Sequence, residues 1–190
     1  MSAAHLPQDR WLDLSELLRE LLAQGRISQD AAEQAMSVRH QAAGNLLHPL
    51  EVIAGQQLPD LQQLGTHLNL ESLTAWLARQ AGQPYLRIDP LRIDVASITP
   101  LMSFAFAQRH KILAVAVDGQ SVTVASAQPY VRAWETDLAH VLKRTVRRVV
   151  ASPLDIQRLT LEFYRLAKSV SGASSEQKAS GLGNLSLIHI

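Results

Sequence analysis

The chain has 190 residues, 47% of them hydrophobic, so it can bury the core of one ordinary domain or two small ones, and general disorder is not expected. Lys plus Arg total 18 against 17 for Asp plus Glu, and the net charge of +1 leaves no overall field to attract nucleic acid or an anionic membrane. Cysteine is absent, which excludes disulfides and thiolate ligands, and neither a membrane-spanning stretch nor a signal peptide is recognisable, so we expect a cytoplasmic protein.

Helical patterns dominate residues 1–82, which we expect to form an N-terminal helical region. Apolar residues recur at steps of three and four over residues 12–40 and predict two amphipathic helices. Gly25 is expected to end the first of them in a left-handed conformation, and Ser28 to cap the second. Further elements are predicted in this order: a short helix over residues 49–54, a loop over 55–65, and a helix over 70–80 that Asn69 caps.

Residues 83–167 alternate between a period of two and a period of 3.6, which predicts a compact two-layer αβ domain with a small mixed sheet. The chain as a whole is therefore expected to be α+β. Asp118-Gly119-Gln120 separates two β-rich runs and predicts a hairpin, because Asp-Gly tolerates positive φ. The expected elements are a strand over 85–88, a helix over 94–108, hairpin strands over 112–117 and 121–125, a helix over 129–143, a strand over 146–151, and a helix over 153–167.

The composition changes again at residues 168–190, which are rich in Ser, Gly, Ala, Glu, Gln and Lys. Such a segment has too little apolar surface to fold alone, so we expect a flexible linker or tail. Its last residues, LSLIHI, are apolar and have no evident partner in the sequence.

Three segments carry a resemblance to a known family: LxxWLARQAGQPYLRIDP, LMSFAFAQRHKILAVAVDGQSVTVASAQP and VVASPLDIQRLTLEFY, which follow one another over residues 73–164. In this order they resemble the N-terminal domain of the type II secretion system protein E and of the type IV pilus assembly ATPases. In that family a flexible segment leads into a catalytic ATPase domain. The resemblance therefore implies a fragment that docks or regulates a motor domain.

Nucleotide chemistry is not expected from these residues. ATP hydrolysis by this family needs the phosphate loop GxxxxGK[ST], which is absent, and Gly181 and Gly183 have no lysine after them. We expect no cofactor here, with ATP and Mg confined to the motor domain. The seven histidines lack metal-ligand spacing, and an independent enzyme remains open only if a pocket gathers histidine with carboxylates.

Some members of the family bind cyclic di-GMP through two helical repeats with an Arg-Leu-Gly signature. The corresponding positions here are Glu16, Leu17 and Leu18 in the first repeat, and Leu47, His48 and Pro49 in the second. A carboxylate at Glu16 replaces the guanidinium that would pair with phosphate or stack on guanine. A structural hairpin is favoured, and a cyclic di-GMP sensor stays as the alternative function.

Two groups of residues are candidate partner contacts. One is the apolar face of the first hairpin, with Trp11, Leu14, Leu17 and Leu21. The other is the basic group of Lys143, Arg144, Arg147 and Arg148, which is either a solvated helix end or a face for an acidic partner. Aromatic residues are too few nearby to favour nucleic acid.

The resemblance implies two partners. They are the cytoplasmic part of an inner-membrane secretion platform protein and the ATPase domain of the same chain. Membrane association would then be indirect, through the platform protein, and binding energy would come from an apolar patch with a polar rim.

Overall fold

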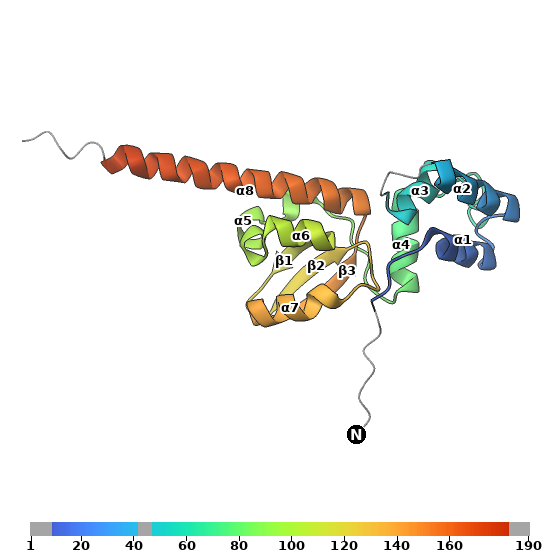
Figure 1. Ribbon diagram of the computed structural model, residues 1–190, viewed down its shortest axis with the longest axis horizontal. Coiled ribbons are helices and arrows are strands. Elements are labelled where there is room, and N and C mark those ends of the chain that lie inside the picture. The colour runs from blue at the N-terminus through green and yellow to red at the C-terminus, as the bar shows by residue number, and fades with distance from the viewer. Residues whose placement is uncertain (1–8, 42–46, 183–190) are drawn as a thin grey trace, which may run out of the picture.

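The computed structural model describes residues 9–41 and 47–182 and confirms the α+β class (Figure 1). Residues 9–82 form a helical lobe, and residues 83–182 form an αβ lobe. The helical lobe contains α1 (Leu14–Ala23), α2 (Gln29–Gln41), α3 (Pro49–Gly55) and α4 (Leu70–Gln80). The αβ lobe contains η1 (Pro90–Arg92), α5 (Val95–Ile98), η2 (Thr99–Leu101), α6 (Phe104–His110), β1 (Ile112–Val117), β2 (Ser121–Ser126), α7 (Ala133–Leu142), β3 (Thr145–Val150) and α8 (Pro153–Leu182).

The helical lobe follows the predicted helices closely. Gly25 has φ +67°, the left-handed conformation expected of the residue that ends α1, and the Ser28 hydroxyl accepts a hydrogen bond from the Ala31 amide. Asn69 caps α4. The apolar sides of these helices form one core, in which the buried side chains include Leu17, Leu21, Leu50, Ile53, Leu73, Trp76 and Leu77.

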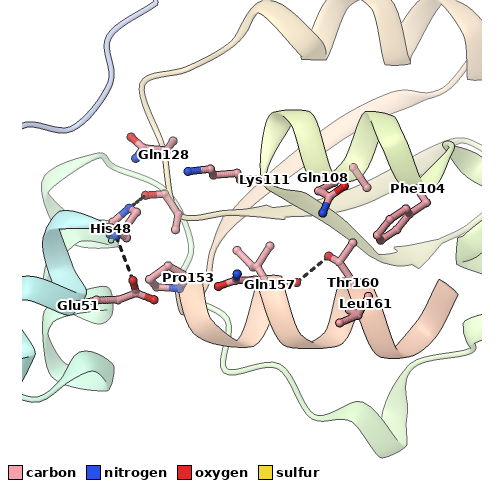
Figure 2. Close-up of a pocket in the computed structure, with 13 residues that line it drawn as sticks. His48, Glu51, Phe104, Gln108, Lys111, Gln128, Pro153, Gln157, Thr160 and Leu161 are labelled. Carbon is pink, nitrogen blue, oxygen red and sulfur yellow. Dashed lines mark hydrogen bonds between the residues drawn. The ribbon is translucent and has the colours of Figure 1, made fainter. Parts of the chain in front are cut away.

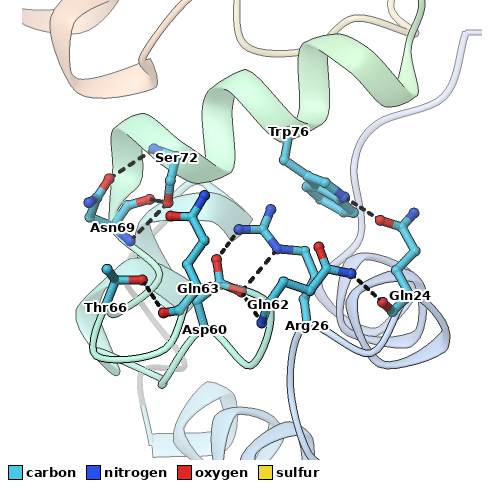
Figure 3. A network of polar contacts seen from close by, with 9 residues as sticks. All are labelled: Gln24, Arg26, Asp60, Gln62, Gln63, Thr66, Asn69, Ser72 and Trp76. Carbon is cyan, nitrogen blue, oxygen red and sulfur yellow. Dashed lines mark hydrogen bonds and ion pairs between the residues drawn. The ribbon is translucent and has the colours of Figure 1, made fainter.

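A buried ion pair closes the helical lobe (Figure 3). Arg26 and Asp60 are 6% and 4% exposed, and both oxygens of the carboxylate face the guanidinium. The Asp60 carboxylate also accepts the Gln62 amide at 3.1 Å. Burial alone would raise the pKa of Asp60, but the hydrogen bond from Arg26 and that amide outweigh it and lower the pKa. The pair fastens the turn after α1 to the loop after α3.

The αβ lobe is built on a mixed sheet in the order β1-β2-β3. β1 and β2 are antiparallel, and β2 and β3 are parallel with Val124 opposite Arg148. Helix α7 connects β2 to β3 and covers one face, while α5, α6 and α8 cover the other (Figure 1). Trp134 from α7 and Leu159 from α8 are buried on the two faces, so the sheet is covered on both.

The predicted hairpin is present, but its turn works differently from the expectation. Asp118 accepts hydrogen bonds from the amides of Gln120 and Ser121, at 2.8 and 2.6 Å, and from the Ser121 hydroxyl at 2.7 Å. Gly119 does not have a positive φ. The aspartate side chain therefore closes the turn as an Asx turn, and glycine freedom is not needed.

The predicted strand over residues 85–88 is wrong. Tyr85 makes one parallel bridge to Val150, with two backbone hydrogen bonds of 2.8 Å from Leu86 to Val150 and from Val150 to Pro84. Asp89 then caps η1 and turns the chain away from the sheet. Because the chain turns away from the sheet at Asp89, Tyr85 makes a single bridge to β3 and the segment does not become a strand.

The single helix predicted over residues 94–108 is three short elements. α5 ends at Ile98, and η2 contains Pro100, which has no amide hydrogen to continue an α-helix. Met102 is extended with φ −151°, and Ser103 caps a new helix, α6, by accepting the Phe106 amide at 3.1 Å. The apolar period continues across the break because all three pieces cover the same face of the sheet.

The last two helices differ from the prediction in length. α7 begins at Ala133 instead of residue 129, because the preceding residues contact the helical lobe. α8 continues to Leu182 through most of the predicted linker, and Figure 1 shows it running beyond the sheet. Residues 168–173 are exposed, so this part of the helix has no core of its own and continues from the packed N-terminal half. The LSLIHI sequence lies outside the described residues.

Candidate functional site

The two lobes meet at residues 127–133, which we call the junction loop. Val150 at the end of β3 is packed in the core of the helical lobe, and Tyr130 of the loop packs against that core. Three hydrogen bonds reach the loop from other segments: Leu12 N donates to Gln128 Oε1 at 2.9 Å, His48 Nε2 donates to Ala127 O at 2.8 Å, and Gln83 Nε2 donates to Pro129 O at 3.0 Å. In the other direction, the loop amides of Arg132 and Ala133 donate to the Asp9 carboxylate at 2.7 and 3.0 Å. The junction therefore combines apolar packing between the two lobes with a network of hydrogen bonds to the loop.

Arg148 supports the junction loop from within the αβ lobe. Its guanidinium donates to the carbonyls of Gln128, Pro129 and Val131, at 3.4, 3.0 and 2.9 Å, and pairs with Glu135 at 3.2 Å. The side chain is only 6% exposed and lies 5.2 Å from the centre of the Trp134 ring. Burial lowers the pKa of Arg148, and the charge of Glu135 partly opposes that shift. The prediction that Arg148 contacts a partner is wrong, because its side chain is buried and its two terminal nitrogens donate inside the domain.

His48 links α3 to the junction loop. Its Nδ1 accepts the Leu50 amide at 3.1 Å as an N-cap, so the proton sits on Nε2 and is donated to Ala127 O. Glu51 completes a capping box by accepting the His48 amide at 3.0 Å. Burial lowers the pKa of His48 to about 4, against the hydrogen bond to Ala127, and the charge of Lys111 lowers it further. A neutral imidazole is thus part of the junction.

Acidification is expected to weaken the fold through His48. Between pH 6.5 and about pH 4 the unfolded chain protonates His48 and the folded chain does not, so the free energy of unfolding falls as pH falls. The total loss is on the order of 3 kcal/mol. His48→Asn keeps a capping side chain but cannot be protonated, so denaturant titrations at neutral pH and at about pH 5 should show a flatter pH dependence. His67→Asn, at an exposed position, is the control, and an unchanged slope in His48→Asn would contradict the assignment.

Beside His48 is a hollow of about 390 Å³, which we call the junction groove (Figure 2). It lies between the start of α3, helix α6 and the start of α8. Its apolar wall contains Phe104, Ile156 and Leu161, and its polar groups are on Glu51, Gln108, Lys111 and Gln157. Sequence reasoning missed this site because its residues come from four separate segments, near residues 50, 108, 128 and 157.

The apolar face of the first hairpin is not a free surface. Leu14, Leu17 and Leu21 are 4%, 2% and 0% exposed, because α2 and α3 of the same chain pack against α1. The prediction that these three leucines receive a partner helix is therefore wrong. Trp11, at 52% exposed, is the member of that group that lies on the surface.

The basic group is divided by the strand alternation of β3. Arg147 is exposed and Arg148 is buried on the opposite face. Lys143 and Arg144 border a shallow hollow of about 900 Å³ together with Arg132. Lys143, Arg144 and Arg147 make no ion pair with any described residue, so this smaller basic face remains a candidate contact.

The first-repeat positions of the cyclic di-GMP signature, and His48 of the second repeat, have structural roles here. Glu16 pairs with Arg10, and Leu17 and Leu18 are each 2% exposed. In the second repeat, His48 is committed to the junction. Within residues 9–41 and 47–182, no three His, Cys, Asp or Glu residues are grouped as a metal site would require. Gly181 lies in α8, and Gly183 lies outside the described residues.

Among residues 9–41 and 47–182, every helix is either too short or too polar to be a membrane span.

Residues 81–170, which contain the mixed sheet and helices α5, α6 and α7, match the MshEN domain family. The chain belongs to the N-terminal domains of the type II secretion protein E and type IV pilus assembly ATPase family.

Individual relatives and solved structures are similar to much of this chain. The type IV pilus assembly ATPase TfpB of Acinetobacter baylyi is 33% identical over 165 residues, which cover 86% of this chain and 28% of that protein. A solved structure of MshE with cdg has a TM-score of 0.50 at 16% identity, covering 80% of this chain and 99% of that one. The N-terminal domain of XpsE aligns with a TM-score of 0.47 at 14% identity, covering 80% and 96%.

Proposed function

We propose that this chain is the non-catalytic docking and regulatory domain of a secretion or pilus assembly ATPase, and that it holds the motor to the cytoplasmic part of an inner-membrane platform protein. The chain spans 28% of the length of the related pilus ATPase, so most of a protein of that size lies beyond it. ATP and Mg chemistry would belong to the ATPase domain. The domain would be cytoplasmic, with membrane association through the platform protein alone.

The junction is the observation that carries this proposal. A domain that anchors a working motor must not bend between the partner and the motor. Here the core of the helical lobe includes Val150 of the sheet, and Arg148 ties the junction loop to β3. These contacts join the two lobes, and α8 extends from the αβ lobe away from the helical lobe (Figure 1).

Calorimetric titration of the chain with the purified cytoplasmic domain of the platform protein from the same system tests the proposal. We expect saturable binding with a dissociation constant of about 1 μM, or about −8 kcal/mol. If the basic face contributes, Lys143→Glu with Arg147→Glu should weaken binding, while Arg79→Glu, a charge reversal at an exposed residue of α4, should not. Absence of heat with the native chain at about a hundred times that concentration, at two temperatures that differ by about 15 °C, would rule out docking by this chain.

A cyclic di-GMP sensor is the second candidate function, and the fold shared with MshE is the observation that favours it. Against it, Glu16 places a carboxylate where the family signature has arginine, and the leucines beside it are buried. The same calorimeter separates the two functions. Saturable heat with cyclic di-GMP that becomes stronger in Glu16→Arg, which restores the cation of the signature, would establish the sensor and would place the ligand on α1.

A further inference from the structure

The apolar wall of the junction groove is a preformed surface. The Phe104 ring lies 5.5 Å from the Tyr164 ring, and the Tyr164 hydroxyl donates to Met102 O at 2.7 Å. This hydrogen bond fixes the position of the aromatic pair. Leu161 is 40% exposed at the edge of this wall, while Ile156 is buried beneath it. An apolar surface held open in this way can bind a side chain with little reorganisation.

Two amides lie on the two helices that border the groove. Gln108 projects from α6 and Gln157 from α8, and both are exposed (Figure 2). Neither side chain makes a hydrogen bond to another described residue. Each carboxamide offers a donor and an acceptor, the complement of a peptide group. Their placement suits an extended segment of backbone that crosses the groove.

The charge of the groove suits a single anion. Lys111 is its only cation within the described residues, is exposed, and makes no ion pair there. Glu51, on the α3 side, is negative and already accepts the His48 amide. His48 is neutral at physiological pH because burial lowers its pKa to about 4. With one unpaired cation and one carboxylate of its own, the groove favours a ligand group that carries a single negative charge and disfavours the several charges of a polyphosphate.

We propose that the junction groove binds a peptide segment of a partner protein in which an apolar side chain lies within two residues of a carboxylate. The apolar side chain covers Phe104 and Leu161, the backbone pairs with Gln108 and Gln157, and the carboxylate pairs with Lys111. A hollow of about 390 Å³ is at the small end of ligand sites and fits one large side chain with its backbone. This rests on the docking function proposed above and names the surface and the partner's chemistry.

The test uses two probes with the 190-residue chain, N-acetyl-Phe-Glu-amide and its uncharged match N-acetyl-Phe-Gln-amide, followed by amide chemical shifts in NMR. We expect saturable shifts confined to α6, Lys111 and residues 153–161, with the Glu probe binding about threefold more tightly. Lys111→Met should remove that preference. Lys143→Met is the matched control, because Lys143 also follows a helix with φ +51°, against +52° at Lys111, but lies at the end of α7. Leu161→Ser should weaken both probes.

Equal binding of the two probes, or shifts confined to the helical lobe, would overturn the peptide site. Its failure can be told from failure of the docking function by repeating the platform-domain titration with Lys111→Met and Leu161→Ser. Unchanged affinity in both variants would mean that docking is real and uses another surface. Probe binding without platform binding would retain the groove and reject the platform protein as its partner.

Discussion

Arg148→Met is expected to lower the free energy of unfolding by about 3 kcal/mol and to loosen the junction loop. Methionine fills much of the space but offers no donor, so three carbonyls and Glu135 lose a partner in a place where water replaces it poorly. Urea denaturation measures the loss of stability. Hydrogen exchange at residues 127–133 measures the local effect.

Arg147→Met, on the adjacent residue of the same strand, is the matched control. Arg147 is exposed and makes no ion pair with a described residue, so we expect a change within about 0.5 kcal/mol and unaltered exchange at the junction loop. If Arg147→Met and Arg148→Met lowered the free energy of unfolding equally, the loss of one positive charge would explain the result, and the role of Arg148 in the junction would be refuted.

The second large effect is expected in the helical lobe. Arg26→Met leaves the Asp60 carboxylate buried without its guanidinium, which should cost about 3–5 kcal/mol at neutral pH. Asp60 has a lowered pKa in the native chain, so its stabilising contribution is complete above the unfolded value of 3.8 and is lost as pH falls through the lower folded value. The variant should therefore lose less stability than the native chain on acidification in that range.

Two comparisons isolate the buried pair. Arg26→Met with Asp60→Leu removes both charges and should recover much of the lost stability, because the unpaired carboxylate is gone. Arg87→Met breaks the exposed pair with Glu71, whose side chains are 76% and 57% exposed, and should cost about 0.5 kcal/mol or less. No recovery in the double variant would show that packing, and not the pairing of charges, explains the cost.

The candidate site was much less accessible to sequence reasoning than the fold. Lys143, Arg144 and Arg147 were predicted from their clustering and remain candidates on the surface, but Arg148 has the same local pattern and the opposite role. Alternation along a strand separates neighbours onto two faces, and the sequence does not show which face the loop covers. The groove joins residues near 50, 108 and 157, which only the packing of the two lobes brings together.

Local chemistry decided most of the elements. A left-handed Gly25, the caps at Ser28 and Asn69, and the hairpin around Asp118 act over a few residues, and the sequence alone was enough to predict where they begin and end. The family was likewise readable from the ordered segments over residues 73–164. Tertiary structure decided the rest. It covered the apolar face of α1 with the chain's own helices, reduced the predicted strand at Tyr85 to one bridge, and turned His48 and Arg148 into junction residues. The reason is physical: caps and turns depend on neighbours along the chain, whereas burial and hydrogen-bond pairing depend on segments that meet only after folding.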